Sequence, residues 1–302
     1  MVKTTNSVSE ADFNSLSQKY GIPRSVDKGS LKFLYHYTDV TGLFNIVKDN
    51  CLWATHYKFL NDNTELRWAL SRAKYFLEKK RRFQKSAFVS AFIDEALSRI
   101  DANNSPFEAY LLCLSSERDS LSQWRAYGGR KGYAIGIDFE DLSVMSFPIV
   151  EHSWFVKVEY NKSTQDTVIS TAINEVFALL RRAEKNNQRI SKEWARLYFD
   201  VIVAELSIYF KHPAFKDEAE WRMVLVQPTD GVSYRPTNRG LVPYLNIAFP
   251  LGGQPRVPIK SVRLGPGADP MKEGIEVKRF MAQHEHDAIS VTYAAAPVEQ
   301  NI

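Results

Sequence analysis

The chain has 302 residues, of which 44% are hydrophobic, 25% charged and 13% aromatic. This balance is typical of a globular protein and excludes a disordered chain, a collagen and a coiled coil. Lys and Arg exceed Asp and Glu by 39 − 35 = 4, which is far below the excess of a dedicated nucleic-acid coat protein. The two cysteines lie in apolar stretches without metal-ligand spacing, so neither a structural zinc nor a disulfide framework is predicted.

The N-terminal segment carries acidic residues where a secretory leader would have a basic and then an apolar region. No segment approaches 18 consecutive apolar residues. We therefore expect a cytoplasmic protein without membrane contact. Residues 1–28 are polar and predict an extension made of a short helix and a loop.

The first half of the chain alternates strand and helix signals. The apolar run 33–37 predicts a buried strand, the spacing in 43–47 a short helix, and residues 51–55 a second strand. Residues 64–100 have a helical pattern, in which we interpret the basic stretch 79–82 as a solvated face rather than a nucleic-acid contact. Two further strands are predicted near 110 and 133, joined by a polar, glycine-containing loop.

The second half adds a strand near 155 and helices over 167–209. Strands near 221, 262 and 289 follow, and the Pro- and Gly-rich segment 228–258 predicts a loop plus an edge strand. Strands at both ends with helices between them predict one mixed α+β domain over residues 29–302. Its helical insertions would be about 64–100 and 167–209.

Four clusters mix aromatic with polar or charged side chains: Tyr35 to Thr38, Phe59 to Asp62 with Glu65, Ser122 to Gly128, and Phe215 to Arg222. His36, at a strand end between two tyrosines, could bond a sugar hydroxyl while a neighbouring ring stacks on a heterocycle. The alternative is a core histidine with its hydrogen bonds satisfied inside the protein.

The acidic cluster precedes the strand near 221. In an extended chain Glu218 and Glu220 would share one face, because they are two residues apart. A carboxylate with the Trp221 ring beside it could polarise a sugar hydroxyl or stabilise a cationic intermediate. The alternative is an ion pair with Lys216 or Arg222.

Other catalytic patterns are absent from the sequence. There is no GxGxxG after a strand, no GxxxxGK[ST], no HExxH and no GxSxG. His284 and His286 have no obvious third ligand beside them. No metal site is therefore predicted.

Five short motifs occur in a characteristic order: His36-Tyr37-Thr38, Leu60 to Asn63 with Glu65, Trp124 with Tyr127, Glu218 to Arg222, and Leu264 to Pro266. This order resembles a widespread bacterial family, domain of unknown function number twenty-nine seventy-one, over about residues 31–295. That family name confers no activity.

A strand ending in His-Tyr-Thr, then a short helix and a strand, is also similar to the opening of the ADP-ribosyltransferase fold. The resemblance implies a split sheet with peripheral helices, NAD as the substrate and no metal. It implies that His36 bonds the adenosine ribose and that Thr38 lies beside it. Tyr127 or Tyr133 would stack on nicotinamide.

By the same resemblance Glu220 would bond the nicotinamide ribose and stabilise an oxocarbenium-like transition state, with Glu218 competing for that role. Tyr37, Asn61, Trp124 and Arg222 complete the expected NAD-binding set. The implied function is ADP-ribosyl transfer to a protein, a nucleic acid or water, as a bacterial toxin or antiviral (phage-defence) effector. The alternative is a non-catalytic module that binds a nucleotide or a partner on the same fold.

Overall fold

A computed structural model describes residues 31–60, 63–101, 108–129, 131–143, 150–185, 190–228, 231–238, 240–248, 250–251 and 254–295. The predicted extension 1–28 and the predicted site residue Asn61 lie outside these ranges. The chain divides into two compact units. We call them the helical unit (the described residues of Thr64–Phe107 and Glu159–His212) and the sheet unit (the described residues of Asp27–Asn63, Glu108–Val158 and Pro213–Ile302). That residues 29–302 fold as one domain stays a prediction.

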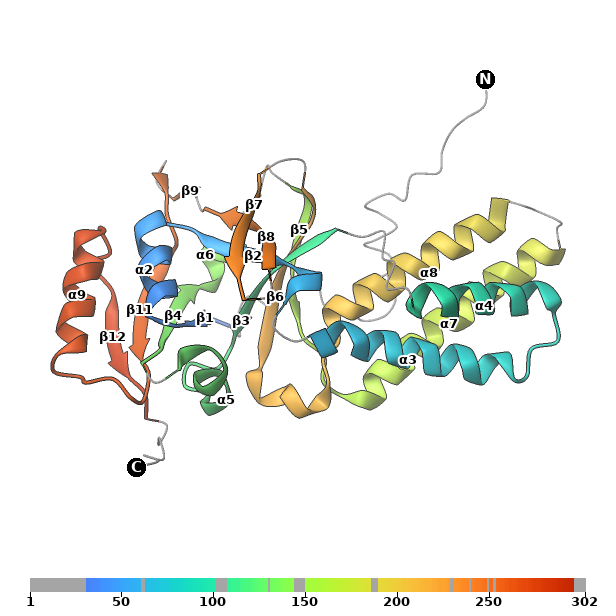
Figure 1. Ribbon diagram of the computed structural model, residues 1–302, viewed down its shortest axis with the longest axis horizontal. Helices are drawn as coiled ribbons and strands as arrows, with labels where there is room; N and C mark the ends of the chain where they lie inside the picture. Colours follow the sequence, from blue (N-terminus) through green and yellow to red (C-terminus); the bar gives the residue numbers. More distant parts are fainter. Residues whose placement is uncertain are drawn as a thin grey trace, which may run out of the picture. The chain divides into compact units, whose positions relative to one another are not determined.

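The helical unit contains four long helices: α3 (Asn63–Arg81), α4 (Ala87–Asp101), α7 (Lys162–Lys185) and α8 (Ile190–Tyr209). They confirm the helical pattern predicted for 64–100 and 167–209, and Figure 1 shows them as long coiled ribbons. Their buried faces are apolar, with Leu77, Ile93 and Val176 fully enclosed. Lys79, Arg81 and Arg82 are exposed at the end of α3, as expected for a solvated face.

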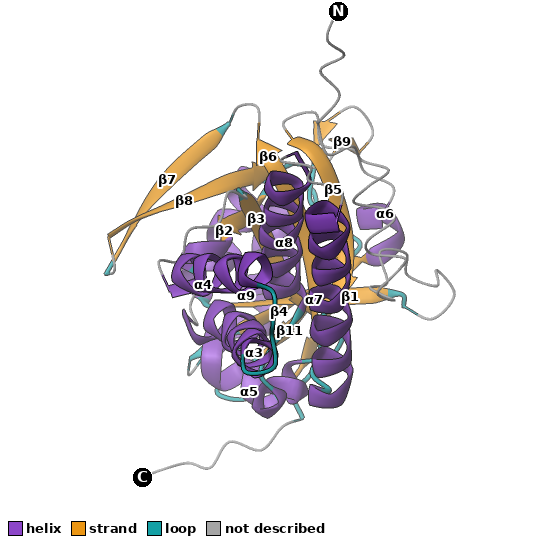
Figure 2. Cartoon of the chain, turned by 90° about the vertical axis from the view of Figure 1, so that its right-hand side faces the viewer, coloured by secondary structure: helices purple, strands orange, loops and turns teal. Residues whose placement is uncertain are grey.

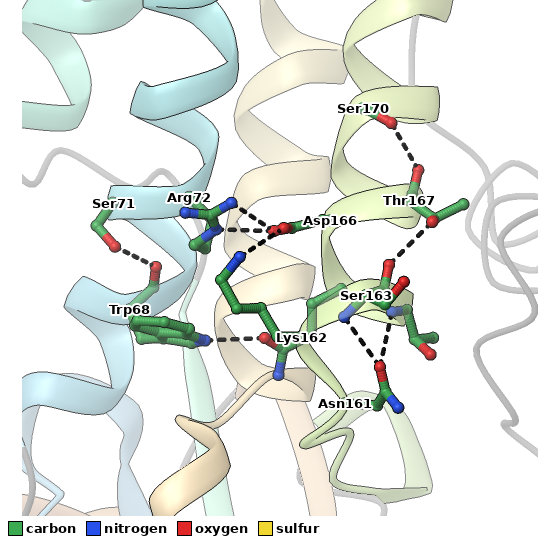
Figure 3. A network of polar contacts seen from close by, with 11 residues as sticks. Trp68, Ser71, Arg72, Asn161, Lys162, Ser163, Asp166, Thr167 and Ser170 are labelled. Atoms are coloured by element: carbon green, nitrogen blue, oxygen red, sulfur yellow. Dashed lines mark hydrogen bonds and ion pairs between the residues drawn. The ribbon is translucent and has the colours of Figure 1, made fainter.

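Polar contacts fix α3 against α7 within this unit (Figure 3). Arg72 and Lys162 both bind the Asp166 carboxylate, at 2.7 and 2.9 Å. The Trp68 indole N–H donates to the buried Gln165 Oε1 at 2.9 Å. The Gln165 amide in turn donates to the carbonyls of Glu159 and Lys211. Because a buried amide must find partners, this network determines how the helices align.

The sheet unit contains a ten-stranded sheet in the order β12-β11-β4-β1-β3-β2-β8-β7, with β6 pairing to both β3 and β5. Among the described strands of this sheet, β11 and β12 pair in parallel and the other pairs are antiparallel. The strands are β1 (Phe33–Thr38), β2 (Leu52–His56), β3 (Ala109–Ser115), β4 (Tyr133–Asp138), β5 (Val150–Lys157), β6 (Glu220–Pro228), β7 (Val232–Thr237), β8 (Gly240–Ile247), β11 (Ile259–Leu264) and β12 (Ser290–Tyr293). The predicted mixed α+β class and all eight predicted strands are confirmed.

Shorter elements connect these strands. The helices are α2 (Val40–Asp49), η1 (Tyr57–Phe59), α6 (Phe139–Ser143), η3 (Pro213–Glu218) and α9 (Glu273–Gln283), and β9 (Pro250–Leu251) and β10 (Gln254–Pro255) form a small hairpin. Within the described residues, no helix is long and apolar enough to cross a membrane.

The strand β3 is where the sheet divides. Along one edge it pairs with β6 from Ala109 to Ser115. Along its other edge it pairs first with β2, at Tyr110 and Leu111, and then with β1, at Ser115. The strands β1 and β2 therefore leave the same edge of β3 in succession, and we call this place, between Leu111 and Ser115, the fork.

Two segments differ from the prediction. The polar loop expected before β4 contains α5 (Leu121–Gln123) and a π-helical turn, η2 (Trp124–Gly128), because burial of Trp124 overrides the polar composition around it. In the segment expected as a loop plus an edge strand, the edge strand is confirmed as β7, but it is joined by a second strand, β8, in a hairpin. Its prolines hide the strand pattern, and Pro236 is tolerated because β7 is the sheet's edge. Figure 2 shows this hairpin as two long strands.

Candidate functional site

A row of paired residues crosses three strands at the fork. Tyr35 of β1 pairs with Ser115 of β3, and Ser115 pairs with Glu220 of β6. Neighbouring strands are about 4.8 Å apart, so the Cα atoms of Tyr35 and Glu220 are separated by about 10 Å. His36 is the next residue along β1. The His-Tyr-Thr strand and the glutamate strand thus flank one central strand.

His36 is partly buried beside the fork. Its Nδ1 lies 3.4 Å from the Cys113 carbonyl oxygen, which can only accept a hydrogen bond. Nδ1 therefore carries the proton, and Nε2 of the neutral ring is an acceptor. Burial lowers the pKa of His36, and the nearby charge of Arg235 lowers it further. At neutral pH the side chain is neutral.

We expect the protein to lose stability as the pH falls from 7.5 to 5.5. Burial also lowers the pKa of His56 and His286. Below about pH 6.5 these histidines therefore bind protons in the unfolded chain but not in the folded chain, which favours unfolding. Thermal unfolding should show a lower melting temperature at pH 5.5, and His36→Gln should reduce this pH dependence. A melting temperature equal at both pH values would contradict the prediction.

Tyr37 and Trp124 form a buried brace. The Tyr37 hydroxyl donates to the Glu117 carbonyl at 2.7 Å and accepts from the Ser120 N–H at 2.9 Å. Its ring meets the Trp124 ring edge-on, with centroids 4.8 Å apart. The Trp124 N–H donates to Asp119 at 2.8 Å. These contacts hold the segment that follows β3, so any effect of the pair on a ligand would act through the position of that segment.

Glu220 is 5% exposed and forms a bidentate ion pair with Arg222, which is 1% exposed. Arg222 Nε lies 2.7 Å from one carboxylate oxygen, and Arg222 Nη2 lies 3.0 Å from the other. The pairing follows from the sequence, because residues two apart in a strand share a face. Of the two ion pairs that the sequence left open, the structure contains the one with Arg222.

Glu218 does not share an extended strand with Glu220, so that expectation is wrong. Glu218 ends the 3₁₀ helix η3, and Ala219 has a left-handed φ of 45° before β6 begins. The reversal at Ala219 breaks the two-residue alternation that the prediction assumed. The Glu218 carbonyl accepts a hydrogen bond from the Ser115 hydroxyl at 2.6 Å.

The remaining predicted residues lie on two strand ends and one helical turn. Thr38 at the end of β1 pairs with Tyr133 at the start of β4. Tyr133 is buried, and burial raises its pKa, whereas Tyr127 on η2 is 36% exposed. Tyr127 therefore has the more accessible ring of the two predicted to stack on nicotinamide.

Two residues near the fork were not predicted as site residues from the sequence. Ser115 lies at the centre of the three-strand row, and only its position at the end of a predicted strand could have indicated it. Arg235 lies in the segment predicted as a loop plus an edge strand, where nothing local distinguishes it. No group of three or more His, Cys, Asp or Glu side chains that could hold a metal occurs among the described residues.

The protein is of the mixed α+β class, with a mostly antiparallel open sheet. The strand that contains His36 and the strand that contains Glu220 lie on either side of β3. Residues 123–223 match the family model described as "Protein of unknown function (DUF2971)". The match includes Trp124, Glu220 and Arg222, and it supports the predicted family resemblance over this part of the chain. No curated protein and no solved structure matches the chain.

Proposed function

We propose that the protein binds NAD at the fork and cleaves its nicotinamide–ribose bond, passing the ADP-ribosyl group to water, a protein or a nucleic acid. The observation that supports this most is the row Tyr35–Ser115–Glu220. It sets the His36 strand and the Glu220 strand on opposite edges of β3, within the length of one dinucleotide.

The chemistry suits these two side chains. Cleavage breaks the C–N glycosidic bond, the electron pair leaves with nicotinamide, and positive charge builds on the ribose. A fixed carboxylate such as Glu220 stabilises that charge, and the acceptor then bonds to the ribose carbon and releases its proton to solvent. Nε2 of neutral His36, as an acceptor, can take a hydrogen bond from the adenosine ribose hydroxyl.

A non-catalytic nucleotide-binding module is the second candidate, and one observation favours it. The Glu220 carboxylate is buried and shares both oxygens with the Arg222 guanidinium. A nearby cation offsets the negative charge that the transition state would require. In this case the same residues hold the nucleotide without turnover.

Incubating the purified protein with NAD labelled in the nicotinamide ring separates the two candidates. Released nicotinamide supports cleavage, whereas saturable binding without product supports the binding module. If the protein neither binds NAD nor releases nicotinamide, both candidates are wrong. His36→Ala should weaken NAD binding by up to about 10-fold through loss of one hydrogen bond, while the matched control His284→Ala, at the end of α9, should leave it unchanged.

A further inference from the structure

Arg235 of β7 is held by side chains from two other strands. Its guanidinium carbon lies 5.2 Å from the centre of the Trp53 ring and 5.8 Å from that of the Tyr244 ring. The two rings are themselves 4.6 Å apart. Arg235 Nη2 donates to the Thr55 hydroxyl at 3.0 Å. We call Trp53, Thr55, Arg235 and Tyr244 the Arg235 cluster.

The sheet register assembles this cluster. Thr55 of β2 pairs with Tyr244 of β8, and Tyr244 pairs with Ser233 of β7. Trp53 and Arg235 lie two residues from that row, so they share its face. Since strand pairing sets the guanidinium against the rings, binding a ligand there would cost little further ordering.

The charge of Arg235 is not balanced by an acidic neighbour in the part of the chain that the structure describes. Its contacts there are the Thr55 hydroxyl and the two aromatic rings. A guanidinium has five N–H donors, of which one is used in the cluster. Burial lowers the pKa of Arg235, but arginine remains charged at any physiological pH.

The cluster lies beside the fork, because Thr55, which accepts the hydrogen bond from Arg235, pairs with Leu111 of β3. The charge of Arg235 also contributes to the lowered pKa of His36. The two residues belong to the same compact unit. A nucleotide bound at the fork would therefore have the Arg235 cluster beside it.

We infer that Arg235 binds a phosphate group of the nucleotide at the fork, with Trp53 and Tyr244 holding the guanidinium plane. This inference rests on the proposed function and adds to it a residue that recognises the pyrophosphate. A planar guanidinium can bind two phosphate oxygens at once through parallel N–H groups. The residue is a binding residue, because it would contact the ligand away from the bond that breaks.

Calorimetric titration with ADP-ribose and with inorganic pyrophosphate tests the inference. Arg235→Gln should bind both probes about 10- to 100-fold more weakly than the wild type. Arg279→Gln, which removes the same charge from an exposed ion pair on α9, should bind them as the wild type does. Arg235→Lys keeps the charge but loses the planar guanidinium, so it should show an intermediate loss of affinity. If Arg235→Gln does not fold, the affinity of Arg235→Lys decides the question.

The outcomes separate the two proposals. Wild-type affinity for ADP-ribose in Arg235→Gln would overturn the inference and leave the proposed function intact. If the wild type binds pyrophosphate through Arg235 but binds neither NAD nor ADP-ribose, the proposed function fails and the phosphate site stands. If the wild type binds none of these probes, both are wrong.

Discussion

Replacing Glu220 with glutamine is expected to lower the free energy of unfolding by about 3–5 kcal/mol. The amide keeps the shape of the side chain but removes the charge that faces Arg222. Because both side chains are buried, water cannot replace the lost interaction. Urea unfolding of the variant and the wild type, followed by circular dichroism, measures the difference.

The double variant Glu220→Gln with Arg222→Met is the control for this result. It removes both charges together, so it should recover much of the stability that the single variant loses. Glu218→Gln, at a partly exposed position outside β6, should change stability little. An unchanged urea midpoint in Glu220→Gln would mean that the pair contributes nothing to folding.

The same substitution tests catalysis only when the folded fraction is known. If Glu220 stabilises the transition state, turnover per folded molecule should fall by roughly 100-fold in Glu220→Gln. Loss of nicotinamide release that merely follows the loss of folded protein would favour the binding module. Measuring unfolding and activity at one temperature distinguishes these cases.

Truncating Trp124 to alanine should lower the free energy of unfolding by about 3–5 kcal/mol. The indole is 2% exposed, so its removal leaves a cavity beside Tyr37, and Asp119 loses a hydrogen-bond donor. Thermal and urea unfolding both report this loss.

Tyr127→Ala is the matched control on the same helical turn. Its ring is 36% exposed, so the substitution should leave the melting temperature nearly unchanged. If Tyr127 stacks on nicotinamide, NAD binding should nevertheless weaken. Equal destabilisation by the two substitutions would contradict the view that Trp124, and not Tyr127, braces the segment after β3.

Local patterns in the sequence were sufficient to predict most of the helices and strands. The apolar run of β1 and the helical spacing in α3 and α8 are local signals, because a side chain's exposure follows the period of its own element. The ion pair of Glu220 with Arg222 was among the sequence-based alternatives for the same reason, since alternation along one strand places both on one face.

Only the tertiary structure decided which distant residues meet. Strand register joins Tyr35, Ser115 and Glu220. Two strand pairings bring Arg235 to Thr55. Neither arrangement produces a periodic pattern in the sequence. The left-handed turn at Ala219 separates Glu218 from the strand, although Ala is a residue that seldom adopts it. Pairing and burial across the fold selected these conformations, because long-range contacts outweigh the weak preferences of single residues.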